Sequence, residues 1–423
     1  MNILFASFLQ PDAPSGVRVH YLQLAELLRQ RGHRVDFVTT GSLTGWRRKA
    51  VGALRHGLHW LGPFTRALAV EMSNFQLIQR AINTRQEYDL VHAHDAGSGV
   101  AASRALGGHV PVVVTGHFNG HPGKEVVLQN ALSGLSARQT MRWHNFLLAN
   151  TRYFIGVSEY VCRQTAPLLP AGALHAKVHN GIDLKCFGQA PPDAELQRLA
   201  RGRHVLLNVG HLEPRKNQQF LLRVAQELLA YRQDFVVAFA GSGPDETLLR
   251  QQIAARGLQD VALLLGQRHE VAPLLRASTL YVHTATNESF GLVLLEAMAC
   301  GVPALALAVG GIPEVLAAAP EALLPATASA TAVARHLHGL LDSPAACADL
   351  QRRQADYAAT HFDAAQMVEA TLVFYRDTIR HFEGQCGHDK PTQAAPLHAA
   401  PTPTEPLVVP QTTHSRRQYT PVE

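Results

Sequence analysis

Residues 287–303 read NESFGLVLLEAMACGVP, and this stretch decides how the rest of the chain is interpreted. A polar segment carrying Glu288 leads into a short apolar run, after which Gly301 and Pro303 are residues that stop helices. The pattern predicts a loop followed by a short helix. Because the first N–H groups of a helix lack partners within it, those near Ser289 to Leu292 would point outward and favour an anion such as a diphosphate.

Two acidic residues stand on this stretch. Glu288 would lie at the mouth of the helix and Glu296 about two turns along it. Both can reach one ligand only if that ligand is long, such as a sugar joined to a nucleotide. Two glutamates eight residues apart are usually surface residues. Here the neighbouring positions are apolar, and an uncompensated carboxylate in such a setting is costly, which favours a binding role.

Upstream, the chain alternates apolar strands with helical periodicity. Residues 2–8 read as a buried strand, 19–31 as a helix that stops at Gly32, and 34–39 as the next strand. Strand, helix, strand at this spacing is typical of a parallel βαβ unit. Further strands are expected at 90–93, 110–115 and 153–157.

A second alternation of strands and helices begins near His204, with strands expected at 205–209 and 235–240. The prediction is an α/β chain of two doubly wound domains, since 423 residues exceed what one core usually holds. We expect domains at 1–187 and 198–363, joined by the Pro-rich segment 189–193. A helix over about 363–383 would return to the first domain, and the Pro- and Thr-rich tail 384–423 is expected to be disordered.

Composition bounds the cellular setting. The five cysteines are scattered without a CxxC pair, which fits a reducing compartment rather than a disulfide framework or a structural zinc site. The first residues lack the features of a signal peptide, and no stretch reaches the length of a membrane-spanning helix. We therefore expect a cytoplasmic protein, with peripheral contact to the inner face of the membrane as an option.

Charge is distributed unevenly along the chain. Residues 1–190 hold 19 Lys and Arg against 10 Asp and Glu, whereas the remainder holds 19 against 23. Such asymmetry fits either a face for an anionic partner or ordinary solvated surface charge. A nucleic-acid partner is not expected.

The combination of motifs resembles the retaining GT-B glycosyltransferases of family GT4. Glu288 and Glu296, followed by 301–303 and 310–314, look like that family's E-x7-E region. Five further stretches agree in order: 14–16, 89–94, 114–117, 179–183 and 209–217. The resemblance spans about residues 1–383. It implies two facing Rossmann-like domains around a cleft, with the donor bound mostly by the second domain and the hydroxyl acceptor by the first.

The resemblance also implies residue roles. Lys216 and Arg215 would neutralise the donor diphosphate, which gains negative charge as the glycosidic bond breaks. Glu288 would bind hydroxyls of the transferred sugar and Glu296 those of the ribose. Gly16 would let the backbone approach the phosphate, where a side chain would clash.

The remaining donor contacts would come mainly from backbone groups. They are implied at Ser289, Phe290, Gly291 and Leu292 for the donor, and at 266–271, with Arg268, for the base. His117 would serve on the acceptor side, where it forms the catalytic set with Glu288 and Lys216. His211 departs from the family pattern because it stands where members often have an arginine, a role that Arg215 is expected to fill.

His92 and His94 share one face of their strand, as a metal site would require. No third ligand has convincing spacing, and Asp95 would point away if the strand continued. The resemblance favours a metal-independent site, so both histidines are expected to pack or to lie on the acceptor side. No metal and no cofactor are expected, and the co-substrate would be a UDP- or GDP-linked sugar.

Residues 46–63 read as a basic amphipathic helix. It would either dock on an anionic membrane, which suits a lipid-linked acceptor, or pack on its own domain. Alternatives to a transferase are a nucleotide-sugar epimerase or phosphorylase of the same fold, and a non-catalytic nucleotide-sugar-binding protein. A dehydrogenase is disfavoured because 241–244 is a poor match to GxGxxG.

Overall fold

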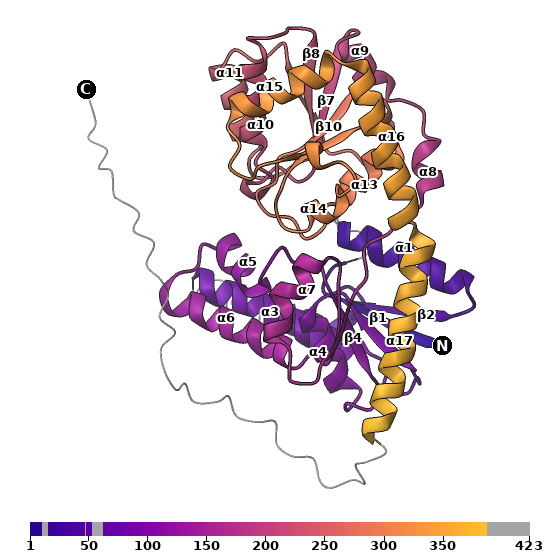
Figure 1. Cartoon of the computed structure of the whole chain (residues 1–423). Coiled ribbons are helices and arrows are strands. Elements are labelled where there is room, and N and C mark those ends of the chain that lie inside the picture. Colours follow the sequence, from indigo (N-terminus) through magenta and orange to yellow (C-terminus); the bar gives the residue numbers. More distant parts are fainter. Residues whose placement is uncertain (11–15, 47, 53–61, 387–423) are drawn as a thin grey trace. The chain divides into compact units, whose positions relative to one another are not determined.

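The structure, a computed structural model, describes residues 1–10, 16–46, 48–52 and 62–386 (Figure 1). By contacts the chain divides into one compact unit, Met1–Phe382, and a second unit, Glu383–Glu423. Most of the tail predicted to be disordered, residues 387–423, lies outside the described residues.

The first unit contains two six-stranded parallel sheets, which confirms the α/β prediction. The first sheet has the order β2-β1-β3-β4-β5-β6. Its strands are β1 Asn2–Ser7, β2 Arg34–Thr39, β3 Leu90–Ala93, β4 Val112–Gly116, β5 Tyr153–Gly156 and β6 Leu174–Lys177.

The first sheet is covered on both faces, which explains why its inner strands β1, β3, β4 and β5 are buried along nearly their whole length, whereas the edge strands β2 and β6 carry exposed residues. Successive side chains on a strand point to opposite faces. Accordingly, Leu4 and Ala6 of β1 pack with α3 (Pro63–Ala81) and α4 (Ala96–Ala105), whereas Ile3 and Phe5 pack with α1 (Gly16–Gln30) and α17 (Ala364–Cys386). Helix α17 contributes five core residues to this second layer: Met367, Val368, Leu372, Phe374 and Tyr375.

The second sheet has the order β12-β11-β10-β7-β8-β9. Its strands are β7 His204–Val209, β8 Phe235–Ala240, β9 Ala262–Gly266, β10 Leu280–His283, β11 Ala304–Leu307 and β12 Leu323–Leu324. The helices that accompany it are α10 Gln218–Leu228, α11 Glu246–Ala255, α12 Ala272–Arg276, α13 Leu292–Ala299, α14 Ile312–Val315, α15 Ala330–Leu341 and α16 Pro344–His361.

The remaining helices of the chain connect or cover these parts. They are α5 Pro122–Gln129, α6 Gly134–Ala149, α7 Glu159–Thr165, α8 Leu184–Gly188 and α9 Ala194–Ala200. The predicted linker 189–193 falls between α8 and α9. Gly181, in the turn predicted at 179–183, packs closely against Ala364 at the start of α17. The next residue, Ile182, donates its N–H to the Phe362 carbonyl at 3.0 Å.

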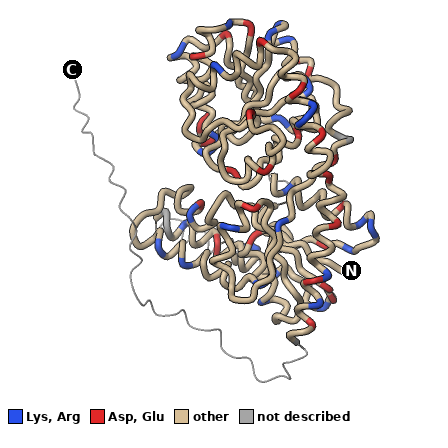
Figure 2. The backbone as a smooth tube through the Cα atoms, in the orientation of Figure 1, with Lys and Arg blue, Asp and Glu red and all other residues tan. Residues whose placement is uncertain are grey.

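The predicted amphipathic helix at 46–63 is described only in part, since residues 47 and 53–61 lie outside the described residues. Within the part that is described, Val51 is buried with Leu43 and Leu77, as packing on its own domain would require. Among the described residues, no helix is both long and apolar enough to cross a bilayer. Figure 2 shows Lys and Arg interspersed with Asp and Glu along the backbone, a distribution that fits solvated surface charge.

Candidate active site

The loop between β10 and α13 is held in place by close backbone packing. Gly311 N–H donates to the Glu288 carbonyl at 3.0 Å. A side chain at Gly310 would place its Cβ 1.9 Å from that same carbonyl oxygen, so only glycine fits there. Gly291, with φ of 92°, turns the chain into α13. The two glycines at 310–311 therefore position the segment that carries Glu288.

Glu288 meets two cations from the second sheet's first loop. Lys216 Nζ lies 2.5 Å from Glu288 Oε2, and Arg215 Nη1 lies 3.5 Å from the same oxygen. Arg215 also pairs with Glu213 at 2.7 Å and donates to the Asn287 carbonyl at 3.2 Å. Residues 72 positions apart in the chain are thus brought together, as the donor-site prediction requires.

The Glu288 carboxylate is buried yet ionised. Burial alone would raise its pKa, but Lys216, His283 and Arg215 outweigh burial and hold the pKa of Glu288 well below its ordinary value. His283 Nε2 lies 3.4 Å from Glu288 Oε2, and burial lowers the pKa of this imidazole. The positive charge at this point is therefore carried by Lys216 and Arg215.

Glu296 lies in a different electrostatic situation. Burial raises its pKa from 4.5 to about 7, and its Oε2 atom has no hydrogen-bond partner within the described ranges. Burial raises the pKa of the Tyr281 hydroxyl well above its ordinary value, and the nearby carboxyl groups of Glu296 and Glu288 raise it further. Both acids therefore act on one buried side chain. An unsatisfied buried carboxylate is costly, and hydroxyl donors of a ligand would satisfy it.

The expected backbone contacts at 289–292 are only partly as predicted. Ser289 N–H is not free, because it donates to Asn119 Oδ1 at 2.7 Å. Phe290 is 1 % exposed and its ring packs against His179 and Phe362, so its side chain belongs to the core. Helix α13 begins at Leu292, after the positive-φ Gly291, and its first N–H groups are the anion-binding candidates.

Gly16 comes close to this helix terminus. Pro14 and Ser15 of the predicted glycine loop lie outside the described residues, and Gly16 begins α1. A Cβ at Gly16 would lie 3.3 Å from Leu292 Cδ1. The structure thus brings these two predicted donor residues together. Arg268, predicted among the donor contacts with the base-binding stretch 266–271, pairs through its guanidinium with Glu195 of α9 at 2.6 Å.

The acceptor-side histidines separate into two kinds. His92 is 1 % exposed, with Nε2 2.6 Å from Thr115 Oγ1 and Nδ1 2.5 Å from Tyr375 Oη. Both of its ring nitrogens are used in packing contacts. His94 and His117 instead face each other, with His94 Nδ1 3.5 Å from His117 Nε2. Asp95 does leave the strand, since its carboxylate caps α4 by accepting from Ser98 N–H at 2.6 Å.

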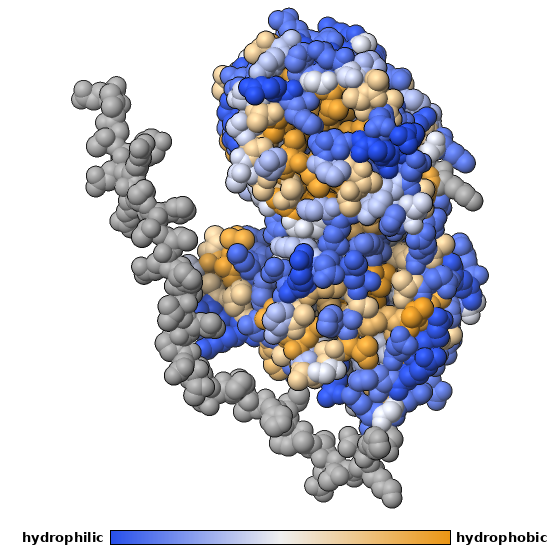
Figure 3. Space-filling model, in the orientation of Figure 1, coloured by the Kyte–Doolittle hydropathy of each residue, from blue (hydrophilic) through white to orange (hydrophobic). Residues whose placement is uncertain are grey.

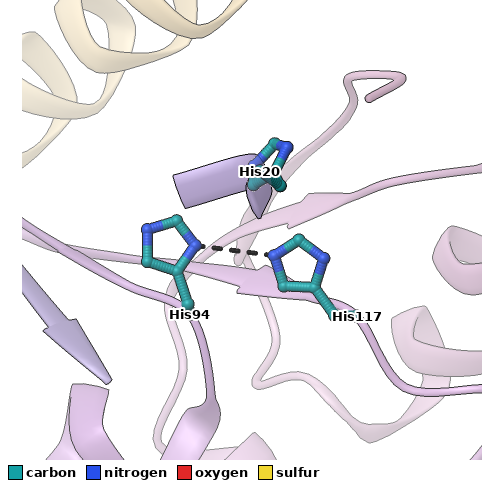
Figure 4. A group of neighbouring side chains, drawn as sticks. All are labelled: His20, His94 and His117. Atoms are coloured by element: carbon teal, nitrogen blue, oxygen red, sulfur yellow. Dashed lines mark hydrogen bonds between the residues drawn. The ribbon is translucent and has the colours of Figure 1, made fainter. Parts of the chain in front are cut away.

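Two residues in this region escaped sequence reasoning. His20 of α1 joins His94 and His117, although 74 residues separate it from His94 (Figure 4). Asn119, in the loop after β4, accepts from Ser289 N–H and from the Asn287 side-chain amide. No local spacing signals either residue, because both act through contacts with distant segments. The one sequence signal for His20 was its position as a histidine on the predicted buried face of the helix that became α1.

A small apolar cavity lies among α3, α5 and α6. Its volume is about 120 Å³ and its lining residues are Ala67, Leu68, Glu71, Val126, Gln139, Thr140 and Trp143. Glu71 is the one acid in this lining, and burial together with Asp95 raises its pKa to about 7. Leu128 and Leu135 are 70 % and 68 % exposed on the neighbouring helices. Figure 3 shows apolar surface over α5.

Comparison with protein families gives two matches that together cover most of the described chain. The model described as Glycosyltransferase Family 4 matches residues 14–186, and the model described as Glycosyl transferases group 1 matches residues 193–361. The junction between the matches, 187–192, coincides with the segment between α8 and α9.

Curated relatives align along nearly their full length. The chain is 30 % identical over 400 residues to D-inositol 3-phosphate glycosyltransferase of Mycolicibacterium paratuberculosis, covering 87 % of this chain and 86 % of that protein. It is 24 % identical over 372 residues to N-acetyl-alpha-D-glucosaminyl L-malate synthase of Bacillus anthracis, covering 85 % and 93 %.

Solved structures share the fold at low sequence identity. The Anabaena protein HepE in complex with UDP and glucose matches with a TM-score of 0.66 and 20 % identity, covering 89 % of this chain and 100 % of that chain. Sucrose-phosphate synthase from Thermosynechococcus elongatus matches with a TM-score of 0.67 and 20 % identity, covering 90 % and 99 %.

Proposed function

The chain belongs to the glycosyl transferases group 1 family and is a glycosyltransferase of GT-B fold, and we propose that it moves a sugar from a nucleotide-diphosphate donor to a hydroxyl acceptor with retention of anomeric configuration. One observation carries the proposal: Lys216, Arg215 and Glu288 gather at the mouth of α13, and Glu296, about one turn into that helix, has an unsatisfied carboxylate oxygen. A long ligand with an anionic centre and hydroxyls at both ends fits this order of charges.

The donor proposal assigns each charged group a task. Lys216 and Arg215 would neutralise the diphosphate, whose negative charge grows as the bond to the sugar breaks. Glu288 would then accept hydrogen bonds from the sugar hydroxyls, in exchange for its present contact with Lys216. Glu296 would accept from the ribose hydroxyls, which would remove the cost of its unsatisfied oxygen. We favour a UDP-linked sugar, because solved structures of HepE contain UDP and UDP-glucose.

The transfer step would need no protein nucleophile. The acceptor hydroxyl attacks on the face from which the diphosphate departs, the bond from the anomeric carbon to the diphosphate oxygen breaks, and the departing diphosphate takes the acceptor proton. His117 would lie on the acceptor side of the sugar. No metal or cofactor is included in this proposal. Exclusion of water between the two domains would limit hydrolysis of the donor.

The acceptor is proposed by class only. Curated relatives are named for inositol phosphate and for malate, both of which offer hydroxyl groups. A lipid-linked hydroxyl acceptor also fits, because α5 and α6, which help to line the apolar cavity, carry the exposed side chains Leu128 and Leu135. The product would enter glycan, polysaccharide or glycolipid synthesis. We propose a cytoplasmic location, supported by five scattered cysteines without a CxxC pair.

A thermal-shift screen with UDP, GDP, ADP and their sugars tests the donor. A ligand at 100 times its dissociation constant stabilises the folded state by about 2.7 kcal/mol. We expect one nucleotide series to raise the melting temperature, and Lys216→Ala to remove the shift while Lys177→Ala, an exposed lysine on β6, retains it. Equal shifts for all three proteins, or none with any nucleotide, would reject the site. NMR of the product then reads the anomeric configuration, and an inverted product rejects retention.

A further inference from the structure

Three histidines from distant parts of the chain meet at one point of the first domain. His20 comes from α1, His94 follows β3 and His117 follows β4. One ring nitrogen from each lies within 4.8 Å of the others. Figure 4 shows the three rings around a common space, with His94 and His117 joined by a contact of 3.5 Å between Nδ1 and Nε2.

We propose that His20, His94 and His117 bind a divalent transition-metal ion of the Zn²⁺ type, and that the bound ion withholds His117 from glycosyl transfer. Such a site would be inhibitory and separate from the reaction, which needs no metal in the function proposed above. It is also distinct from the pair His92 and His94 suggested by strand alternation, since both nitrogens of His92 are already engaged with Thr115 and Tyr375.

The distances suit tetrahedral coordination. Zinc binds imidazole nitrogen at about 2.0–2.1 Å, so two nitrogens on one tetrahedral ion lie about 3.4 Å apart. His94 Nδ1 and His117 Nε2 are 3.5 Å apart already. The ligand nitrogens lie within 4.8 Å of one another, so a small movement of the His20 ring would complete the set by side-chain rotation.

The electronic state of the rings also suits a metal. A neutral imidazole has one nitrogen lone pair to offer, whereas a protonated one has none. Burial lowers the pKa of His20 to about 4 and holds those of His94 and His117 well below the ordinary value. Burial therefore favours the neutral form of these rings, the form that can bind a metal.

An unsatisfied nitrogen points the same way. His20 Nδ1 is buried without a hydrogen-bond partner in the part of the chain that the structure describes. A hydrogen bond between His94 and His117 alone would leave His20 Nδ1 unsatisfied, whereas a shared ion would engage all three rings. His117 is the least buried of the three, so the fourth coordination position would open on its side and take water, as in three-histidine sites with an open position.

The test measures metal binding by the untagged full chain without donor or acceptor, so its result does not depend on the proposed glycosyl transfer. Titration with CoCl₂ followed by visible absorption, and with ZnCl₂ by calorimetry, should show one tight equivalent with a tetrahedral cobalt band. His20→Gln and His94→Gln should each weaken that equivalent at least about 10-fold, the lower range for loss of a supporting group. His175→Ala, an exposed histidine on β6, should bind like the wild type.

X-ray absorption on the zinc-loaded wild type provides a measurement that does not depend on how well the variants fold. Three imidazole ligands and one oxygen support the site. Sulfur ligands, or fewer than three imidazoles, would overturn it, as would equal zinc affinity in the wild type, His20→Gln and His94→Gln. Reversal by EDTA of zinc inhibition of nucleotide release is the expected functional consequence.

Discussion

At the scale of single residues, the proposed donor site is a cluster of buried charges that compensate one another. Glu288 and Lys216 have side chains only 11 % and 16 % exposed, so their contact is more than a screened surface pair. Breaking a buried pair leaves one charge uncompensated. Lys216 thus lowers the pKa of Glu288 and favours its ionised form, and in the proposed function a diphosphate would take the place of Glu288 beside Lys216.

Glu296 should make the stability of the ligand-free protein depend on pH. Its pKa is raised from 4.5 to about 7 in the folded state, so its contribution to stability is full below 4.5 and is lost as pH rises through about 7. Glu296→Gln, which stays neutral, should therefore be more stable than the wild type at pH 8 by roughly 1–3 kcal/mol and should match it near pH 4. Thermal melts across this range measure the difference.

The matched control is Glu26→Gln, on the exposed face of α1. It should follow the wild type at every pH. A constant difference between Glu296→Gln and wild type from pH 4 to pH 8 would contradict the buried, unsatisfied state of this carboxylate.

At the scale of elements, the loop before α13 depends on contacts from the segments that follow β5 and β11. Ser158 Oγ donates to the Ser289 carbonyl at 2.7 Å, and Gly311 packs against both residues. The loop's shape is therefore imposed by its neighbours rather than by its own sequence. The short helix α13 then follows in a direction set by Gly291.

Gly310→Ala should destabilise this loop strongly. The new Cβ would meet the Glu288 carbonyl, and the backbone φ of 56° adds strain for a residue with a side chain. We expect a loss of at least about 2 kcal/mol, together with weaker nucleotide binding, measured by thermal melting and by ligand titration.

Gly339→Ala provides the opposite case. Gly339 lies on the exposed face of α15 with nothing within 4 Å of an added Cβ. This substitution should gain up to about 1 kcal/mol through helix propensity. A similar loss for both alanine variants would show that the contact at Gly310 does not hold the loop.

At the scale of the whole compact unit, Glu314 links segments next to the two sheets. It lies in α14, between strands β11 and β12 of the second sheet, and contacts residues that follow β5 and β6 of the first sheet. Its carboxylate accepts from Glu159 N–H at 2.8 Å and Tyr160 N–H at 3.1 Å, at the start of α7, and lies 3.1 Å from His179 Nε2. Burial would raise the pKa of Glu314, but His179 and the two N–H groups hold it below the ordinary value. An anion at a helix N-terminus is also favoured by the helix dipole.

Removing this link should loosen the start of α7. Glu314→Ala is expected to speed hydrogen exchange at the amides of Glu159 and Tyr160, because both lose their acceptor, and to cost about 1.5–3 kcal/mol of stability. Glu321→Ala, an exposed acid that pairs with Arg353, should leave exchange at Glu159 and Tyr160 unchanged. Unchanged exchange in Glu314→Ala would show that the contact is not maintained in solution.

Local sequence patterns were sufficient for the strands and for the class of fold. The apolar runs at 2–8, 205–209 and 235–240 became buried parallel strands, because a strand covered on both faces must be largely apolar. The strand at 34–39, which contains Arg34 and Asp36, lies at the edge of its sheet. Glu288 and Lys216 were also predicted as one site, although from family resemblance rather than from spacing. The roles of the site residues in donor and acceptor binding stay predictions.

Tertiary structure alone decided which residues meet. It paired Arg268 with Glu195, bound the Ser289 N–H to Asn119, and brought His20 beside His94 and His117. Each outcome depends on segments far apart in the chain. Periodicity reports which face of an element is buried, but the identity of the neighbour across that face is set by how helices and strands pack, and single-chain spacing does not encode it.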